Sequence, residues 1–168
     1  NKVKRKILNM KITNIVLLLL GMVVLNSCKQ DNWLDWKTQN EIWLQENAKK
    51  EGVIPSPSGS GLQYKCIVPG IGQSSGHVDD AKIVTINYSG KLITGYEFDA
   101  NRRYEGYVSS FVPGFSEGLK LMKEFGVYEL YIPYELAYGI EGSGTEGTSS
   151  HIPPYSTLIF RVELLDVY

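Results

Sequence analysis

The chain has 168 residues, of which 43% are hydrophobic and 21% are charged, and its formal net charge is −1. These proportions are typical of a globular protein with one domain of ordinary size and some additional chain, and they exclude an intrinsically disordered protein. Because no basic stripe lies outside the extreme N-terminus, we expect no nucleic-acid partner.

The first 27 residues have the pattern of a secretory signal. Five basic residues within positions 2–11 precede an apolar run, Ile12–Leu25, which is too short and too interrupted for a comfortable membrane span. The following Leu25-Asn26-Ser27-Cys28 resembles the lipobox of bacterial lipoproteins, in which Cys28 would be acylated and become the first mature residue. We therefore expect residues 1–27 to be a lipoprotein signal peptide. The protein would then be lipid-anchored to a membrane of the bacterial cell envelope and face the periplasm or the cell surface; an uncleaved signal anchor is the alternative.

Residues 28–60 are predicted to form a helix and a linker. The helix spans Asp31–Glu51, with Gly52 as its stop, and it carries all three tryptophans, at positions 33, 36 and 43, on one apolar stripe. Docking of this stripe on the following domain is favoured over a dimer contact or a contact with the membrane surface. The Pro-, Ser- and Gly-rich residues 55–61 have the composition of a linker.

Four segments from residue 62 onward have the alternation of β-strands. They are residues 62–68, 83–92, 127–132 and 157–167. Cys66 alternates with apolar residues in the first of them and is expected to be a buried structural thiol. A short helix is predicted to start at Pro113, because Phe115, Leu119 and Met122 recur at helical spacing. The sequence therefore predicts an α+β fold, an antiparallel sheet with one short helix against it, preceded by the N-terminal helix.

Several chemistries have no support in the sequence. The two histidines, His77 and His151, are far apart and have no cysteine partner, so we expect no metal and no cofactor. No Gly-rich phosphate loop and no Gly-x-Ser-x-Gly elbow is present, and the acidic Asp79, Asp80 and Glu135 lack a paired acid. What remains is a set of aromatic residues near turns, which either form the core or line a concave apolar site. They are Tyr88, Phe98, Phe111, Phe115, Tyr138 and Phe160.

Five motifs, in order, resemble those of the FKBP-type peptidyl-prolyl isomerases. They are VTINYSG (84–90), YEFD (96–99), VPGFSEGL (112–119), LAYG (136–139) and IPPYSTLIFRVELL (152–165). The sequence SGLQYK (60–65) is similar to the family's first strand, so the resemblance covers residues 61–168. It implies a twisted antiparallel sheet wrapped around a short helix, which agrees with the elements predicted above.

The resemblance also implies a pocket and roles for its residues. Tyr88, Phe98, Asp99, Tyr138 and Phe160 would be catalytic, and Phe111, Val112, Phe115 and Ile152 would bind substrate. Phe115 stands where many members have Trp, which implies a change in affinity with the aromatic floor retained. Between Asp99 and Phe111 the chain is shorter than in the compact members, and either Tyr104 or Tyr107 is a candidate for a further pocket aromatic.

Residues 139–152 resemble the flap that overhangs the family's pocket, and they are longer here than in the compact members. Their Gly and Ser content predicts mobility. The extra length either reads residues that flank the substrate proline or is a tolerated surface insertion.

The resemblance implies a peptidyl-prolyl cis-trans isomerase that acts non-covalently on Xaa-Pro bonds and assists the folding of exported proteins. Tyr138 would donate a hydrogen bond to a substrate carbonyl, and Asp99 would hold the Tyr88 hydroxyl or face the carbonyl carbon, unless it only caps a turn. The implied partners are proline-containing unfolded or exported polypeptides and macrolide-type inhibitors. The alternative is an envelope chaperone or peptide-binding module that uses the same groove with little turnover. A surface lipoprotein that captures a ligand such as a glycan is a third, weaker hypothesis.

Overall fold

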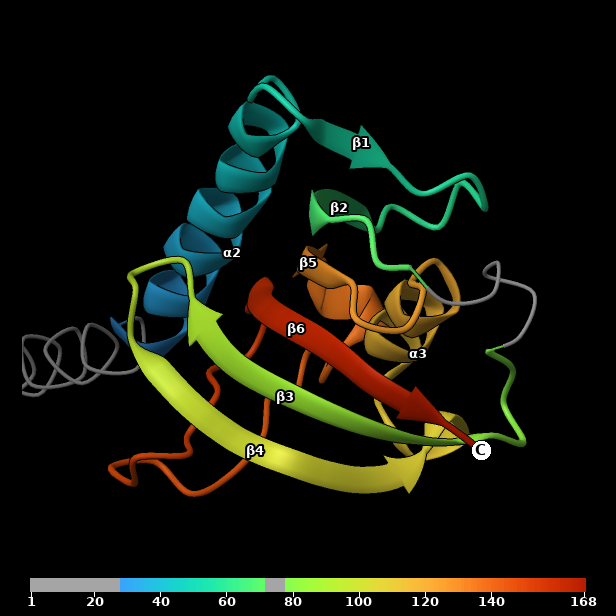
Figure 1. The fold of residues 1–168 in the computed structure, drawn as a ribbon. Coiled ribbons are helices and arrows are strands. Elements are labelled where there is room, and N and C mark those ends of the chain that lie inside the picture. Colours follow the sequence, from blue (N-terminus) through green and yellow to red (C-terminus); the bar gives the residue numbers. More distant parts are fainter. Residues whose placement is uncertain (1–27, 72–77) are drawn as a thin grey trace, which may run out of the picture. The chain divides into compact units, whose positions relative to one another are not determined.

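The computed structural model describes residues 28–71 and 78–168 (Figure 1). The predicted signal peptide, residues 1–27, and His77 lie outside these residues. The chain divides into two compact units, residues 1–35 and 36–168. Of the first unit the structure describes only residues 28–35, which begin helix α2 (Cys28–Asn47). The second unit holds the remainder of α2 and everything that follows.

Six strands of the second unit form one antiparallel sheet in the order β1-β2-β5-β6-β3-β4 (Figure 1). The strands are β1 (Val53–Pro55), β2 (Gln63–Val68), β3 (Ile83–Leu92), β4 (Glu97–Tyr107), β5 (Val127–Ile132) and β6 (Leu158–Val167). The other elements are the helix α3 (Pro113–Lys120) and the 3₁₀ turns η2 (Val108–Ser110) and η3 (Tyr134–Leu136). The predicted α+β class, with a short helix against an antiparallel sheet and an N-terminal helix before it, is confirmed.

The central strand β6 and helix α3 meet in the core as the apolar spacing predicts. Leu158, Phe160, Val162 and Leu164 are all buried and share one face of β6. Helix α3 comes close to β5 because two of its positions have no side chain. A Cβ at Gly114 or Gly118 would lie 2.4 Å from the side chains of Ile132 or Leu130, respectively, so larger residues there would push the helix off the sheet.

The boundaries of the N-terminal helix differ from the sequence prediction. Helix α2 begins at Cys28 rather than at Asp31, and it ends at Asn47 rather than at Glu51. It ends there because the amides from Lys49 onward bond three rather than four residues back, as in Lys50 N–H to the Asn47 carbonyl. Gly52, at φ +79°, completes the turn into β1. In the described part of the chain, no helix is long and apolar enough to cross a membrane.

The predicted linker is an ordered part of the domain. Residues 53–55 form the edge strand β1 on β2, and the hydroxyls of Ser56, Ser58 and Ser60 all donate to Glu117 Oε1 on α3, at 2.6 Å from Ser58 and 3.0 Å from Ser60. Burial raises the pKa of Glu117, but the three hydroxyls and the nearby Lys120 outweigh it and hold the pKa below its ordinary value of 4.5. The serines that indicated flexibility in the sequence therefore bind this segment to α3.

Two other side-chain predictions can be compared with the structure. Trp43 packs on Tyr131 with 5.9 Å between ring centroids, and Trp36 donates to Ser156 Oγ at 3.1 Å, so docking of this part of the tryptophan stripe is confirmed. Cys66 packs against the core but is only partly buried, because its strand β2 lies next to the edge strand β1. The predicted buried thiol is therefore only partly buried.

Candidate active site

A cavity of about 440 Å³ opens between α3, the β3–β4 ribbon and the residues that follow η3. Its volume lies within the range of pockets that bind small ligands, which is about 300–1,000 Å³. The cavity is lined by Tyr88, Asp99, Tyr104, Ser110, Phe111, Val112, Phe115, Tyr138 and Phe160. Seven of the nine residues predicted to form a pocket are therefore brought together, from segments spread between positions 88 and 160.

The floor of the cavity is a set of aromatic rings centred on Phe115, which is only 2% exposed. Phe111 stacks on Phe115 with 4.8 Å between ring centroids, and Phe160 meets it edge-on at 4.9 Å. Tyr88 approaches Phe115 at 6.1 Å in the same edge-to-face manner. Because each ring contacts at least one other ring, the floor is rigid and apolar.

Phe98 and Ile152 do not border the cavity, although the sequence resemblance implied that they would. Both are buried, at 8% and 4% exposure. Phe98 packs behind the cavity wall, with its ring edge-on to Phe160 at 5.5 Å. Gly90 makes this arrangement possible, because a Cβ there would lie 2.6 Å from the Phe160 ring and 2.7 Å from the Phe98 ring. Phe98 therefore supports the wall from behind.

The structure decides between the two tyrosines that the sequence left open. Tyr104 lines the cavity and lies 6.0 Å from Tyr88 and 5.8 Å from Phe111, measured between ring centroids. Tyr107 is 55% exposed and does not reach the cavity. Ser110 also lines the cavity, and no pattern in the sequence indicated it; only its position directly before Phe111 could have done so.

A phenol and a carboxylate form a hydrogen-bonded pair at the rim of the cavity. Tyr88 donates its hydroxyl to Asp99 Oδ2 at 2.8 Å, as one of the two sequence hypotheses for Asp99 proposed. Asp99 lies inside β4 opposite Gly90, so it does not cap a turn. Burial raises the pKa of Tyr88, and its hydrogen bond to Asp99 raises it further. The phenol therefore stays protonated and holds the carboxylate in place.

Tyr138 is 40% exposed and also lines the cavity. Its pKa is raised, first by burial and then by the negative charge of Asp99. A phenol with a raised pKa is neutral at physiological pH and keeps its proton, so the Tyr138 hydroxyl is available as a hydrogen-bond donor to a bound molecule.

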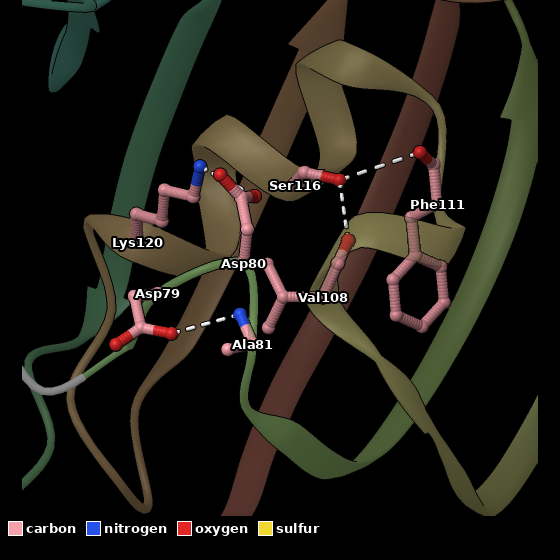
Figure 2. Close-up of polar contacts among 7 residues, drawn as sticks. All are labelled: Asp79, Asp80, Ala81, Val108, Phe111, Ser116 and Lys120. Atoms are coloured by element: carbon pink, nitrogen blue, oxygen red, sulfur yellow. Dashed lines mark hydrogen bonds and ion pairs between the residues drawn. The ribbon is translucent and has the colours of Figure 1, made fainter.

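Ser116 fixes the backbone that carries Phe111, as Figure 2 shows. Its buried hydroxyl donates to the Val108 carbonyl at 2.6 Å and lies 3.3 Å from the Phe111 carbonyl, so α3 holds both ends of η2. The Val108 N–H in turn donates to the Lys82 carbonyl, and Lys120 pairs with Asp80 at 2.7 Å. Helix α3 thus positions the turn before β3 and the turn that presents Phe111.

Residues 139–152 are closed at their base by backbone hydrogen bonds. Ser143 and Ile152 exchange two N–H···O bonds of 2.8 Å, and the Tyr155 N–H donates to the Gly139 carbonyl at 3.0 Å. The loop is also tied to the β3–β4 turn, since the Tyr96 hydroxyl donates to the Ser149 carbonyl at 3.1 Å. The composition predicted mobility, whereas this pairing gives the loop a defined base.

Within residues 28–71 and 78–168, no three His, Cys, Asp or Glu side chains are grouped so that they could hold a metal ion.

Comparisons with known proteins agree on one family. Residues 75–165 match the family described as FKBP-type peptidyl-prolyl cis-trans isomerase. The chain is 43% identical over 129 residues to the FKBP-type 22 kDa peptidyl-prolyl cis-trans isomerase of Escherichia coli, covering 74% of this chain and 58% of that protein. It is 37% identical over 135 residues to the outer membrane protein MIP of Legionella longbeachae, covering 78% of this chain and 54% of that protein.

The crystal structure of FkpA from Escherichia coli superposes with a TM-score of 0.73 at 33% identity, covering 94% of this chain and 71% of that one. The chain therefore belongs to the FKBP-type peptidyl-prolyl cis-trans isomerase family. It spans about half the length of the curated relatives that it matches.

Proposed function

We propose that the protein accelerates cis–trans isomerisation of Xaa-Pro bonds in proline-containing polypeptides. The observation that carries this proposal is the aromatic cavity over Phe115, with the Tyr88–Asp99 pair and the Tyr138 hydroxyl at its rim. Membership in the isomerase family supports it.

The proposed mechanism breaks no covalent bond. Rotation about a peptide bond meets a barrier of about 18–20 kcal/mol because the amide loses its resonance when it twists. The twisted amide is less dipolar than the planar one, so an apolar aromatic cavity stabilises it relative to the ground state. A nucleophile is not needed for this chemistry, which relies on the shape and the polarity of the site.

Seven of the nine residues that line the cavity have a proposed role. Phe111, Val112 and Phe115 bind the proline ring, and Phe160 and Tyr88 close the wall around it. Tyr138 donates its hydroxyl to a carbonyl of the substrate, and Asp99, held by Tyr88, stabilises the carbonyl carbon of the twisting bond. Phe98 and Ile152 act from behind this surface, Phe98 through Phe160 and Ile152 through the base of the 139–152 loop.

The test compares two matched aromatic substitutions in an isomerisation assay with a short Xaa-Pro peptide. Phe115→Leu removes the ring from the cavity floor, and Phe125→Leu removes a ring that is 54% exposed and does not line the cavity. We expect kcat/KM to fall about tenfold or more for Phe115→Leu. For Phe125→Leu, kcat/KM should stay within about twofold of wild type, because this exposed ring makes no contact with the bound transition state. Equal effects of the two substitutions would contradict the proposed site.

The same assay addresses the chaperone alternative. No observation specifically favours a groove that binds without turnover over an isomerase. Such a groove would bind the peptide to the wild-type protein with no acceleration of its cis–trans exchange. A macrolide-type inhibitor is a further proposed ligand of the cavity. It should compete with the peptide, and Phe115→Leu should lower the affinity of the protein for it.

We further propose that the protein acts in the cell envelope on unfolded or exported polypeptides and is anchored there through an acylated Cys28. The pattern of residues 1–28 supports this, as does the name of the Legionella relative, an outer membrane protein. In this arrangement residues 1–27 are a cleaved signal peptide, residues 28–60 are the N-terminal helix and the segment that pairs with the sheet and with α3, and residues 61–168 are the isomerase domain proper. Incorporation of labelled palmitate, abolished by Cys28→Ala, tests the anchor; equal labelling of both proteins would rule it out.

A further inference from the structure

Helix α2 makes hydrogen bonds to residues 153–157, the segment that directly follows the 139–152 loop. Asn40 lies in the middle of α2 and is only 1% exposed. Its Oδ1 accepts a hydrogen bond from the Thr157 N–H at 2.8 Å, and its Nδ2 donates to the Trp36 carbonyl at 2.8 Å. Thr157 is fully buried and stands directly before β6. Without Asn40 this buried N–H would lose the acceptor that the helix provides, and a buried donor without a partner is destabilising.

A second hydrogen-bonded chain leads from the same helix to the end of the loop. Trp36 donates its indole N–H to Ser156 Oγ at 3.1 Å, and Ser156 donates to the Pro153 carbonyl at 2.7 Å. Pro153 directly follows Ile152, which closes the base of the loop against Ser143. Through Ser156, the Trp36 indole therefore fixes the backbone at Pro153, the first residue after the loop.

The same helix also reaches the start of the loop. The Lys37 ammonium lies 5.6 Å from the ring centroid of Tyr155 and 6.0 Å from that of Tyr134, and these two rings pack edge to face at 5.3 Å. The Gly139 N–H donates to the Tyr134 carbonyl at 2.8 Å, while the Gly139 carbonyl accepts from Tyr155. Tyr138, which lines the cavity, lies between the two anchor points Tyr134 and Gly139.

We infer that α2 is a positioning element for the active site, which holds the end of the 139–152 loop through the side chains of Asn40 and Trp36, and its start, next to Tyr138, through Lys37. Three contacts carry the inference: a buried amide accepts from the Thr157 N–H, an indole donates to Ser156, and the Lys37 ammonium lies near the rings of Tyr134 and Tyr155. The effect on activity rests on the proposed function, whereas the effect on the loop does not.

The chain offers a matched control on the same helix for each positioning residue. Asn47 is also 1% exposed, but its Nδ2 donates to Gln63 Oε1 on β2, away from the loop. Trp43 is partly buried like Trp36, and its ring packs on Tyr131 in β5 and under the Lys50 ammonium. Asn40→Ala is therefore compared with Asn47→Ala, and Trp36→Phe with Trp43→Phe.

The experiment measures two quantities for each of the four variants and the wild-type protein. The first is hydrogen exchange of the hydrogen-bonded amides of Gly142, Ser143, Ile152 and Tyr155. The second is KM and kcat for a short Xaa-Pro peptide. We expect Asn40→Ala and Trp36→Phe to raise the exchange of these amides about fivefold or more and to raise KM by a similar factor. The two controls should leave both quantities within about twofold, even where they lower Tm as much.

Each outcome decides the question. If Asn40→Ala and Trp36→Phe change loop exchange no more than their controls, the inference is overturned, whatever the kinetics show. If the exchange pattern is as expected but the wild-type protein does not accelerate isomerisation, the proposed function fails and the positioning role of α2 stands. If Asn40→Ala does not fold, Trp36→Phe, which keeps an aromatic ring and removes only the donor and part of the ring system, gives the answer.

Discussion

Gly90 lies in β3 directly beside the rings of Phe160 and Phe98. Gly90→Ala therefore tests whether the position of these rings is needed for catalysis. The added Cβ would stand 2.6 Å from Phe160 Cε1 and 2.7 Å from Phe98 Cζ. Carbon atoms in contact are normally about 3.5–4.0 Å apart, so the rings must move by about 1 Å. Overpacking of this kind costs about 1–3 kcal/mol, and about 0.5–1 kcal/mol is regained because Ala is favoured over Gly inside a strand. We therefore expect the free energy of unfolding to fall by at most about 2.5 kcal/mol.

The effect on catalysis should exceed the effect on stability. Phe160 contacts Phe115 and Tyr88 at centroid distances of 4.9 and 6.1 Å, so a displaced Phe160 ring disturbs the cavity wall directly. A misplacement of about 1 Å at a catalytic site costs about 100-fold in rate. We expect kcat/KM for a short Xaa-Pro peptide to fall between about 10- and 100-fold. A urea titration should show that the variant is folded in the absence of denaturant.

Gly95→Ala is the matched control. Gly95 lies in the turn between β3 and β4 at φ +86°, and nothing lies within 4 Å of a Cβ added there. Its replacement should cost about 1 kcal/mol of stability through backbone strain, with kcat/KM within about twofold of wild type. The reasoning is refuted if Gly90→Ala, like Gly95→Ala, retains wild-type kcat/KM.

Three further predictions concern stability and pH. Ser116→Ala leaves the buried Val108 carbonyl without its hydroxyl donor, so it should lower the free energy of unfolding by about 1–2 kcal/mol in urea titrations. It should also raise KM, because Ser116 fixes the backbone that presents Phe111; an unchanged KM would contradict this positioning role. Glu117→Gln should cost stability at neutral pH, and the difference from wild type should shrink as the pH falls below 4.5, because the folded-state pKa of Glu117 is depressed; a difference that does not depend on pH would contradict this. Burial, followed by a hydrogen bond to Cys66, raises the pKa of Tyr128 from 10.0 to about 12, so this tyrosine contributes stability that is complete below pH 10 and is lost as the pH rises toward 12. Thermal unfolding from pH 9 to 12 measures this, and Tyr128→Phe should flatten the dependence.

Four of the six strands, β2, β3, β5 and β6, and helix α3 could be predicted because their burial follows local spacing. Strand β4 was missed because it is exposed along most of its length and shows no alternation. The buried face of β6 and the buried Phe115, Leu119 and Met122 are those that the alternation and the helical period indicate. The ordered 53–60 segment was missed because its serines acquire their partner, Glu117, only when residues 57 to 61 positions apart in the chain come together. Composition alone describes such a segment as flexible.

The site was predicted through resemblance, and the differences have physical causes. Tyr88, Asp99 and Tyr138 meet at the cavity as implied. Phe98 was placed in the cavity because the sequence does not show on which side of Phe160 its ring lies, and Gly90 allows it to lie behind. Tyr104 rather than Tyr107 enters the site, which depends on the register of β4 against β3, where Ile86 pairs with Tyr104.

The most direct test of the account is two-dimensional exchange spectroscopy on a short Xaa-Pro peptide with a substoichiometric amount of the protein. The cis and trans signals of the peptide should exchange far faster than the uncatalysed interconversion, which takes about tens of seconds. The peptide should also shift the protein resonances of Tyr88, Phe115 and Tyr138. Exchange at the uncatalysed rate with a folded protein, or acceleration accompanied by shifts only outside the cavity, would contradict the proposed isomerase site.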